Sequence, residues 1–117
     1  MSGFTVERSD KDEVSVLHVF GFLDLHTVPQ FEEAIQNLVN DKRFKIVIDF
    51  RKLDYISSAG LGVFMGFIEE IREQQGDIKL CCMPDRVYKV FDLLGFPALF
   101  EILTSQEEAI QKFNSAG

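Results

Sequence analysis

The sequence predicts an α/β fold built on a central, mostly parallel mixed sheet of four to five strands with about four helices. After the second strand, strand-like and helix-like segments alternate, as in parallel strands joined by helical crossovers. Residues 45–50 form a β-branched, nearly continuous apolar run, which is typical of a central strand covered on both faces. The chain has 117 residues, 46% of them apolar, and this suffices for the core of a single domain over residues 1–117.

Two strands and a helix are predicted before this central strand. Residues 4–7 read as a short first strand, and residues 14–20 as a second, partly alternating one. Gly21 marks a bulge or bend at its end. The next helix begins with a capping-box pattern at Thr27 and keeps an apolar stripe at helical spacing until residues 40–42.

A long helix follows the central strand and is predicted over about residues 59–75. Its buried stripe is expected to be Leu61, Phe64, Met65, Ile68 and Ile71. Val63 and Phe67 fall outside that stripe, so they are expected to be partly exposed and to form a protein-docking surface. The alternative, that they pack under a neighbouring helix, is equally open. Gly62 and Gly66 cost helix propensity on one side of the helix, which suggests close approach of the sheet or of a partner.

The remaining elements are shorter. Residues 78–83 read as a fourth strand, and Pro84 opens a helix that stops at Gly95. Residues 100–103 are a candidate edge strand. Ser105 begins a second capping box and a last helix.

The sequence offers little for catalysis or metal binding. It contains no nucleophile elbow, P-loop or dinucleotide-binding fingerprint. Cys81 and Cys82 are neighbours in the fourth strand, where adjacent side chains point to opposite faces, so we expect free thiols and a reducing compartment. This pair and two distant histidines, His18 and His26, provide too few ligands for a metal site. We therefore expect no metal and no cofactor.

Charge and hydropathy limit the partners. The net charge of −7 disfavours nucleic acid and anionic membrane surfaces. No apolar run reaches transmembrane length and the first residues do not resemble a signal peptide, so we expect no membrane insertion and a cytoplasmic location.

Two adjacent serines, Ser57 and Ser58, stand where the long helix begins. The commoner role of such serines is to cap the helix. The alternative is phosphate attachment, because a helix N-terminus tolerates an anion. Asp24 and Asp54 are candidates for a polar rim around these serines at the carboxyl ends of the strands. For Asp49 and Asp54, the alternative is a solvated acid in a turn.

The chain resembles the STAS domain family, and within it the small single-domain anti-sigma factor antagonists of bacteria. The resemblance covers nearly the whole chain and rests on residues 21–24, 46–50, 56–63 (Ile-Ser-Ser-Ala-Gly-Leu-Gly-Val) and 91–96. It implies a STAS-like fold and a regulator, not an enzyme. In the family, the unphosphorylated antagonist binds an anti-sigma factor that is also a serine kinase, phosphorylation breaks the complex, and a serine phosphatase restores it.

The resemblance also implies a site. Ser58 matches the family's phosphoacceptor, with Ser57 as the less favoured acceptor, because Ser57 stands where the family usually has Asp. The expected partner-binding residues are Asp24, Ser57, Ser58, Ala59, Gly60, Val63 and Phe67. Two other functions stay open: a STAS subunit of a transport or signalling assembly without a phosphorylation cycle, and a small enzyme that uses Ser58.

Overall fold

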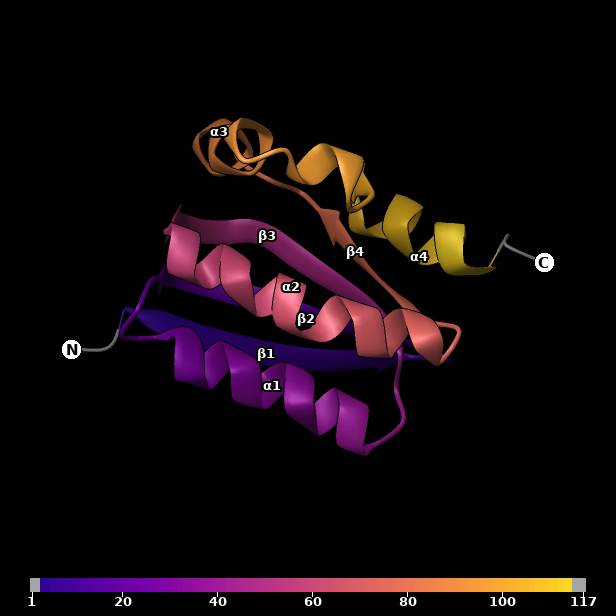
Figure 1. Cartoon of the computed structure of the whole chain (residues 1–117). Helices are drawn as coiled ribbons and strands as arrows, with labels where there is room; N and C mark the ends of the chain where they lie inside the picture. Colours follow the sequence, from indigo (N-terminus) through magenta and orange to yellow (C-terminus); the bar gives the residue numbers. More distant parts are fainter. Residues whose placement is uncertain (1–2, 115–117) are drawn as a thin grey trace.

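A computed structural model describes residues 3–114 of the chain (Figure 1). Its elements are β1 (Phe4–Lys11), β2 (Val14–Leu23), α1 (Val28–Asn40), β3 (Lys45–Ile56), α2 (Ser58–Glu73), β4 (Asp77–Cys81), α3 (Asp85–Leu93), the 3-10 turn η1 (Phe96–Ala98), β5 (Ile102–Leu103) and α4 (Gln106–Asn114). The α/β fold class, the mixed sheet and the number of helices agree with the prediction. None of the helices among these residues has the length and apolarity needed to cross a membrane.

The five strands lie in sequence order, β1-β2-β3-β4-β5. β1 is antiparallel to β2, and every later neighbour is parallel. Each crossover therefore moves in the same direction along the sheet, and right-handed crossovers then place their helices on the same face. The main core accordingly unites residues of α1, α2 and α3, whereas α4 packs with a smaller cluster on the other face.

Phe64 of α2 lies at the centre of the main core. Its ring centroid lies within 6.5 Å of those of Phe31, Phe50, Phe91, Phe96 and Phe100. The pair with Phe50 is tilted and the other four are edge-to-face. Aromatic pairs in favourable geometry contribute about 0.5–1.5 kcal/mol each beyond their buried area. The middle of α2 is thus tied to α1, β3, α3 and the η1 segment at once.

β2 and β3 are longer than the sequence suggested. The register of their pairing shifts between His18 and Phe20 and again between Gly21 and Phe22. Pairing then continues to the end of both strands, where Leu23 lies opposite Ile56. Gly21 has a φ of +88°, and a Cβ there would overlap the carbonyl oxygen of Gly3. Gly21 is therefore a bulge, as predicted. The second strand does not end there, however, because the bulge lets pairing resume beyond it.

The predicted signals at the end of α3 and the start of α4 are both present in the structure. Gly95 has a φ of +79° and follows the end of α3, as predicted. At α4, Ser105 Oγ accepts a hydrogen bond from the Glu108 N–H at 3.1 Å. The Glu108 carboxylate accepts hydrogen bonds from the hydroxyl and N–H of Thr104. A backbone hydrogen bond from Ser105 also helps to lower the pKa of this carboxylate, as the predicted capping box requires.

The two cysteines are free thiols, but the reason predicted for this was wrong. β4 ends at Cys81, and Cys82 has a φ of +62°. Cys82 has therefore left the strand geometry, and its Sγ lies 3.5 Å from that of Cys81 instead of on the opposite face. Burial raises the pKa of the Cys81 thiol, which keeps it protonated at neutral pH.

Candidate functional site

The sequence predicted a site at the carboxyl ends of the strands, and in the structure these are the ends of β2 and β3. Leu23 and Ile56 pair there, and the Ser57 N–H donates to the Leu23 carbonyl oxygen at 2.9 Å. The loop that begins with Asp24 and the start of α2 are therefore neighbours. In open α/β sheets this edge is the usual place for binding.

Asp24 holds its own loop in shape. Its Oδ1 accepts hydrogen bonds from the backbone N–H groups of His26 at 2.9 Å and Thr27 at 3.2 Å. The Thr27 hydroxyl accepts from the Asp24 N–H and donates to the Phe22 carbonyl oxygen. The Thr27 side chain does not cap α1, contrary to the predicted capping box, because these groups already occupy it.

The two serines at the start of α2 differ in exposure. Ser57 is the N-cap residue, but its side chain makes no capping bond, and its Oγ is buried without a hydrogen-bond partner among residues 3–114. Its carbonyl oxygen accepts from the N–H groups of Gly60 and Leu61. Ser58 is the first residue of the helix and is exposed. The structure thus separates a buried hydroxyl from an accessible one in two consecutive residues.

Gly60 brings the first turn of α2 close to the strand ends. It is buried, and a Cβ at this position would lie 2.9 Å from Leu23 Cγ and 3.1 Å from Ile56 Cγ1. A glycine here lets the helix begin directly on the sheet edge. Ala59, beside it, is partly buried.

Of the two alternatives left open for Val63, partial exposure is wrong, and packing inside the protein is confirmed. Val63 is only 3% exposed and belongs to the main core, whereas Met65, which was assigned to the buried stripe, is 49% exposed. α1 and α2 lie side by side (Figure 1), so the buried face of α2 turns toward α1 and is wider than one stripe. Phe67 is partly buried against the same core, and its role in docking stays a prediction.

The glycines on the outer side of α2 do not meet another part of the described chain. A Cβ on Gly62 or Gly66 would have no atom within 4 Å, and both residues are exposed. The sheet is therefore not what approaches them. Of the two explanations offered by the sequence, approach of the sheet is wrong, and approach of a partner stays a prediction.

The acids after β3 need correction as well. Asp54 does not follow the strand; it lies within β3, and its carboxylate faces Arg86 of α3 at 3.4 Å. Arg86 Nε also donates to the Asp54 carbonyl oxygen at 2.9 Å. Asp49 is not a solvated turn acid, because it is 4% exposed on the α4 face of the sheet.

Several apolar side chains near the serines are exposed and were missed by the sequence reasoning. Leu25 is 72% exposed in the loop after Asp24, and the rings of Phe22 and Tyr55 lie 6.2 Å apart with about half of each exposed. Continuing the alternation past Gly21 would have found Phe22, since Leu23 next to it points into the core.

The comparisons with known proteins agree with this architecture. A family model described as the STAS domain matches residues 5–109. The chain belongs to the STAS domain family.

Relatives of this STAS domain carry regulatory names. A protein of Bordetella bronchiseptica named "Putative anti-sigma factor antagonist BtrV" is 33% identical over 112 residues, which cover 96% of this chain and 95% of the relative. The "Anti-sigma-B factor antagonist" of Listeria monocytogenes is 28% identical and covers 88% of this chain and 90% of its own length.

Solved structures share the fold. An anti-sigma factor antagonist from Mycobacterium paratuberculosis superimposes with a TM-score of 0.88 at 25% identity, over 96% of this chain and 95% of that one. The anti-sigma factor antagonist SpoIIAA in its unphosphorylated form gives a TM-score of 0.80 at 27% identity, over 97% and 98% of the two chains.

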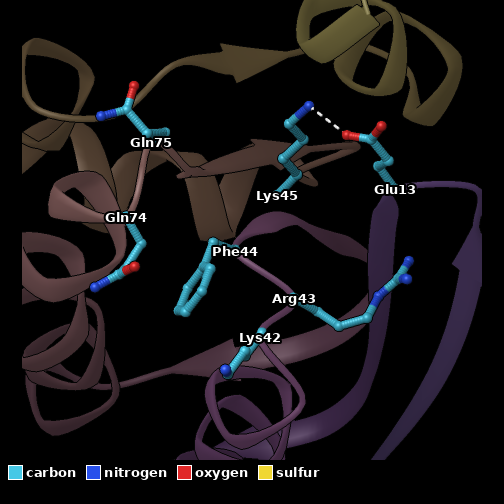
Figure 2. A pocket seen from close by; sticks show the side chains of 7 residues that line it. All are labelled: Glu13, Lys42, Arg43, Phe44, Lys45, Gln74 and Gln75. Carbon is cyan, nitrogen blue, oxygen red and sulfur yellow. Dashed lines mark hydrogen bonds and ion pairs between the residues drawn. The ribbon is translucent and has the colours of Figure 1, made fainter.

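A cavity of about 270 Å³ lies at the other end of the parallel strands of this STAS domain (Figure 2). It is bordered by Lys42, Phe44 and the end of α2, and Lys45 pairs with Glu13 at 2.8 Å. Arg43 points away from the α2 side of the cavity, and its Nε donates to Ser15 Oγ. The cavity therefore lies far along the sheet from Ser58, and two of its cations are already bound to other groups.

Proposed function

We propose that this STAS domain is an anti-sigma factor antagonist that binds an anti-sigma factor with serine kinase activity and is released when Ser58 is phosphorylated. The observation that carries the proposal is the exposure of Ser58, the first residue of α2, next to the exposed side of that helix. The names of the relatives and of the structural neighbours support the same class of activity.

Accessibility favours Ser58 over Ser57 as the phosphoacceptor. A kinase must reach the hydroxyl with its own catalytic groups and with the γ-phosphate of ATP. Ser58 is exposed, whereas the Ser57 Oγ is buried. Serine at position 57, in place of the family's Asp, therefore does not create an equally accessible second acceptor.

The outer face of α2 supplies the docking surface. Ser58, Gly62, Met65 and Gly66 are exposed along it, and Leu25 is exposed on the neighbouring loop. The two glycines leave the helix backbone open to close approach by a partner. Met65 and Leu25 provide apolar contact area of the kind that anchors protein interfaces.

Phosphorylation at this position acts on the complex more than on the fold. A phosphoserine adds about −1.5 to −2 charge at pH 7. The partial positive charge at the N-terminus of α2 favours this negative charge in the unbound protein. In the complex, the same charge must lose its water within an apolar contact, and this costs several kcal/mol unless a cation meets it.

The partners follow from this cycle. The anti-sigma factor kinase is the binding partner, a serine phosphatase regenerates the binding form, and both act on the protein in the cytoplasm. The protein itself needs no catalytic group in this scheme, because the kinase supplies the chemistry.

Phosphate mapping tests the proposal. The purified protein is first used to capture partners from its own cell lysate, and is then incubated with the captured kinase and ATP. We expect one phosphate on Ser58, retained in Ser57→Ala and lost in Ser58→Ala. Phosphate on Ser57 alone would refute the assignment. Capture of a transport or signalling assembly, with no phosphate transfer, would support the alternative STAS function instead.

A further inference from the structure

A second group of reactive side chains lies on the α4 face of the sheet, opposite α2. His18 pairs with Asp49, and Asp49 pairs with Cys81, so these three residues form a row across β2, β3 and β4. Paired residues on neighbouring strands share a face. Cys82 follows directly and extends the row. The proposed partner switch uses none of these side chains.

The spacing of three of them fits a single ion. The Asp49 carboxylate and the Sγ atoms of Cys81 and Cys82 all lie within 4.8 Å of one another, and the two sulfurs are 3.5 Å apart. In a tetrahedral zinc site with Zn–S bonds of about 2.3 Å, two sulfurs are separated by about 3.8 Å. The backbone at Cys82, with its φ of +62°, already turns this thiol toward the other two groups.

Asp49 has the surroundings of a metal ligand. Its Oδ1 accepts from the Arg51 N–H at 2.9 Å, and its Oδ2 from Gln106 Nε2 at 2.9 Å. His18 Nδ1 lies 3.7 Å from the same Oδ2. A carboxylate has about four lone-pair positions, so both oxygens keep capacity for a cation. Such outer hydrogen bonds are what orients metal-binding carboxylates.

Charge and access also suit a cation. Binding would release the protons of both thiols, and the two thiolates with Asp49 would then surround the ion with negative charge. Arg51 Nη2, 3.6 Å from Cys82 Sγ, offsets the excess. A cavity of about 180 Å³ bordered by His18, Asp49 and Gln106 opens beside the carboxylate and provides an entry path.

We propose that Asp49, Cys81 and Cys82 bind a thiophilic divalent cation of the zinc class, with the fourth coordination position open to water. Two sulfur ligands and one oxygen ligand favour zinc or cadmium over magnesium or calcium. The ion would tie β3 to β4 and, through Gln106, to α4. The proposal is independent of the phosphorylation cycle, because the site lies on the other face of the sheet.

Cadmium binding tests this directly. The reduced, metal-free full chain is titrated with Cd²⁺ while the thiolate-to-cadmium absorbance is followed. The sequence contains only these two cysteines, so every thiolate signal comes from this pair. We expect saturation at one Cd²⁺ per chain and displacement by Zn²⁺.

Two variants and a matched control decide the outcome. Asp49→Asn keeps the side chain's shape and should weaken Cd²⁺ affinity by at least about ten-fold, and Cys82→Ser should abolish the saturable signal. Asp54→Asn, which changes an exposed carboxylate outside the site, should bind as the parent does. Zn²⁺ should raise the melting temperature of the parent but not of Cys82→Ser.

Unchanged affinity in a folded Asp49→Asn variant would refute the three-ligand site, and so would two Cd²⁺ per chain or no saturable binding. Circular dichroism melts establish folding. If Cys82→Ser fails to fold, Asp49→Asn and the cadmium stoichiometry still decide.

Discussion

Replacing Ser58 by aspartate should weaken partner binding while leaving the fold intact. The side chain at this position is exposed, and the start of α2 favours a negative charge by about 0.3–1 kcal/mol, so the free energy of unfolding should not fall. In the proposed complex, the carboxylate loses its water at the interface, and this is costly unless a cation of the partner meets it. Arg86, which reaches the end of β3, is already hydrogen-bonded to Asp54.

The expected size of the effect follows from that unpaired charge. Burying a charge without its partner at an interface costs about 2–5 kcal/mol. Even the lower figure corresponds to a loss of about 30-fold in affinity. Phosphoserine carries more charge than aspartate, so phosphorylation should weaken binding at least as much.

Titration calorimetry against the kinase partner, with circular dichroism melts alongside, measures both quantities. Ser58→Ala should bind as the parent does and should no longer respond to ATP. Ser57→Ala is the matched control: it removes a buried hydroxyl that has no partner, so it should keep affinity and keep or raise the melting temperature. If Ser58→Asp binds as tightly as the parent, the electrostatic switch at this position is wrong.

Three further predictions concern α2 and the sheet. Met65→Ala should weaken partner binding by about 1–3 kcal/mol with little change in melting temperature, because this side chain is exposed. Phe67→Ala should lower the melting temperature, because the ring packs against the core. A lower melting temperature for Met65→Ala, or an unchanged one for Phe67→Ala, would contradict the observed faces of α2. Gly60→Val should destabilise the fold by about 1–3 kcal/mol in urea denaturation, because even a Cβ there meets the end of β2, and an unchanged midpoint would refute this close approach. The hydrogen bond from Lys79 lowers the pKa of Glu101 below its usual 4.5, so this carboxylate stabilises the fold above that pH, and the contribution is lost as the pH falls through the folded-state pKa. Glu101→Gln should therefore flatten the acid side of the melting-temperature profile, and an unaltered profile would show that the pair contributes nothing.

Local patterns were enough to predict the fold. Alternating strand and helix signals gave the parallel sheet, and the glycines at 21 and 95 marked a bulge and a helix end. The faces of α2 could not be predicted in the same way, because a helical projection of one segment does not reveal which neighbour covers it. α1 packs beside α2. Val63 is buried, whereas Met65 is exposed.

The row of His18, Asp49 and Cys81 on the α4 face could not be predicted from any one segment, because its residues come from three different strands. The register of three strands brings His18, Asp49 and Cys81 into line, and a left-handed residue turns Cys82 back toward Cys81. Strand alternation alone predicted the opposite direction for Cys82. Similarly, the sequence identified two candidate hydroxyls at the start of α2, but only the packing of the strand ends distinguished the buried Ser57 from the exposed Ser58.

The ring cluster around Phe64 has a consequence for how such proteins diverge. One side of α2 is fixed by contacts to α1, β3, α3 and the η1 segment, whereas the other side, with Gly62, Met65 and Gly66, touches little else in the described chain. Substitutions on sites without shared contacts have nearly additive effects on stability. With partners docked on this outer side, as proposed above, duplicated copies in one cell can acquire separate partners by changing that side alone, without any change to the core.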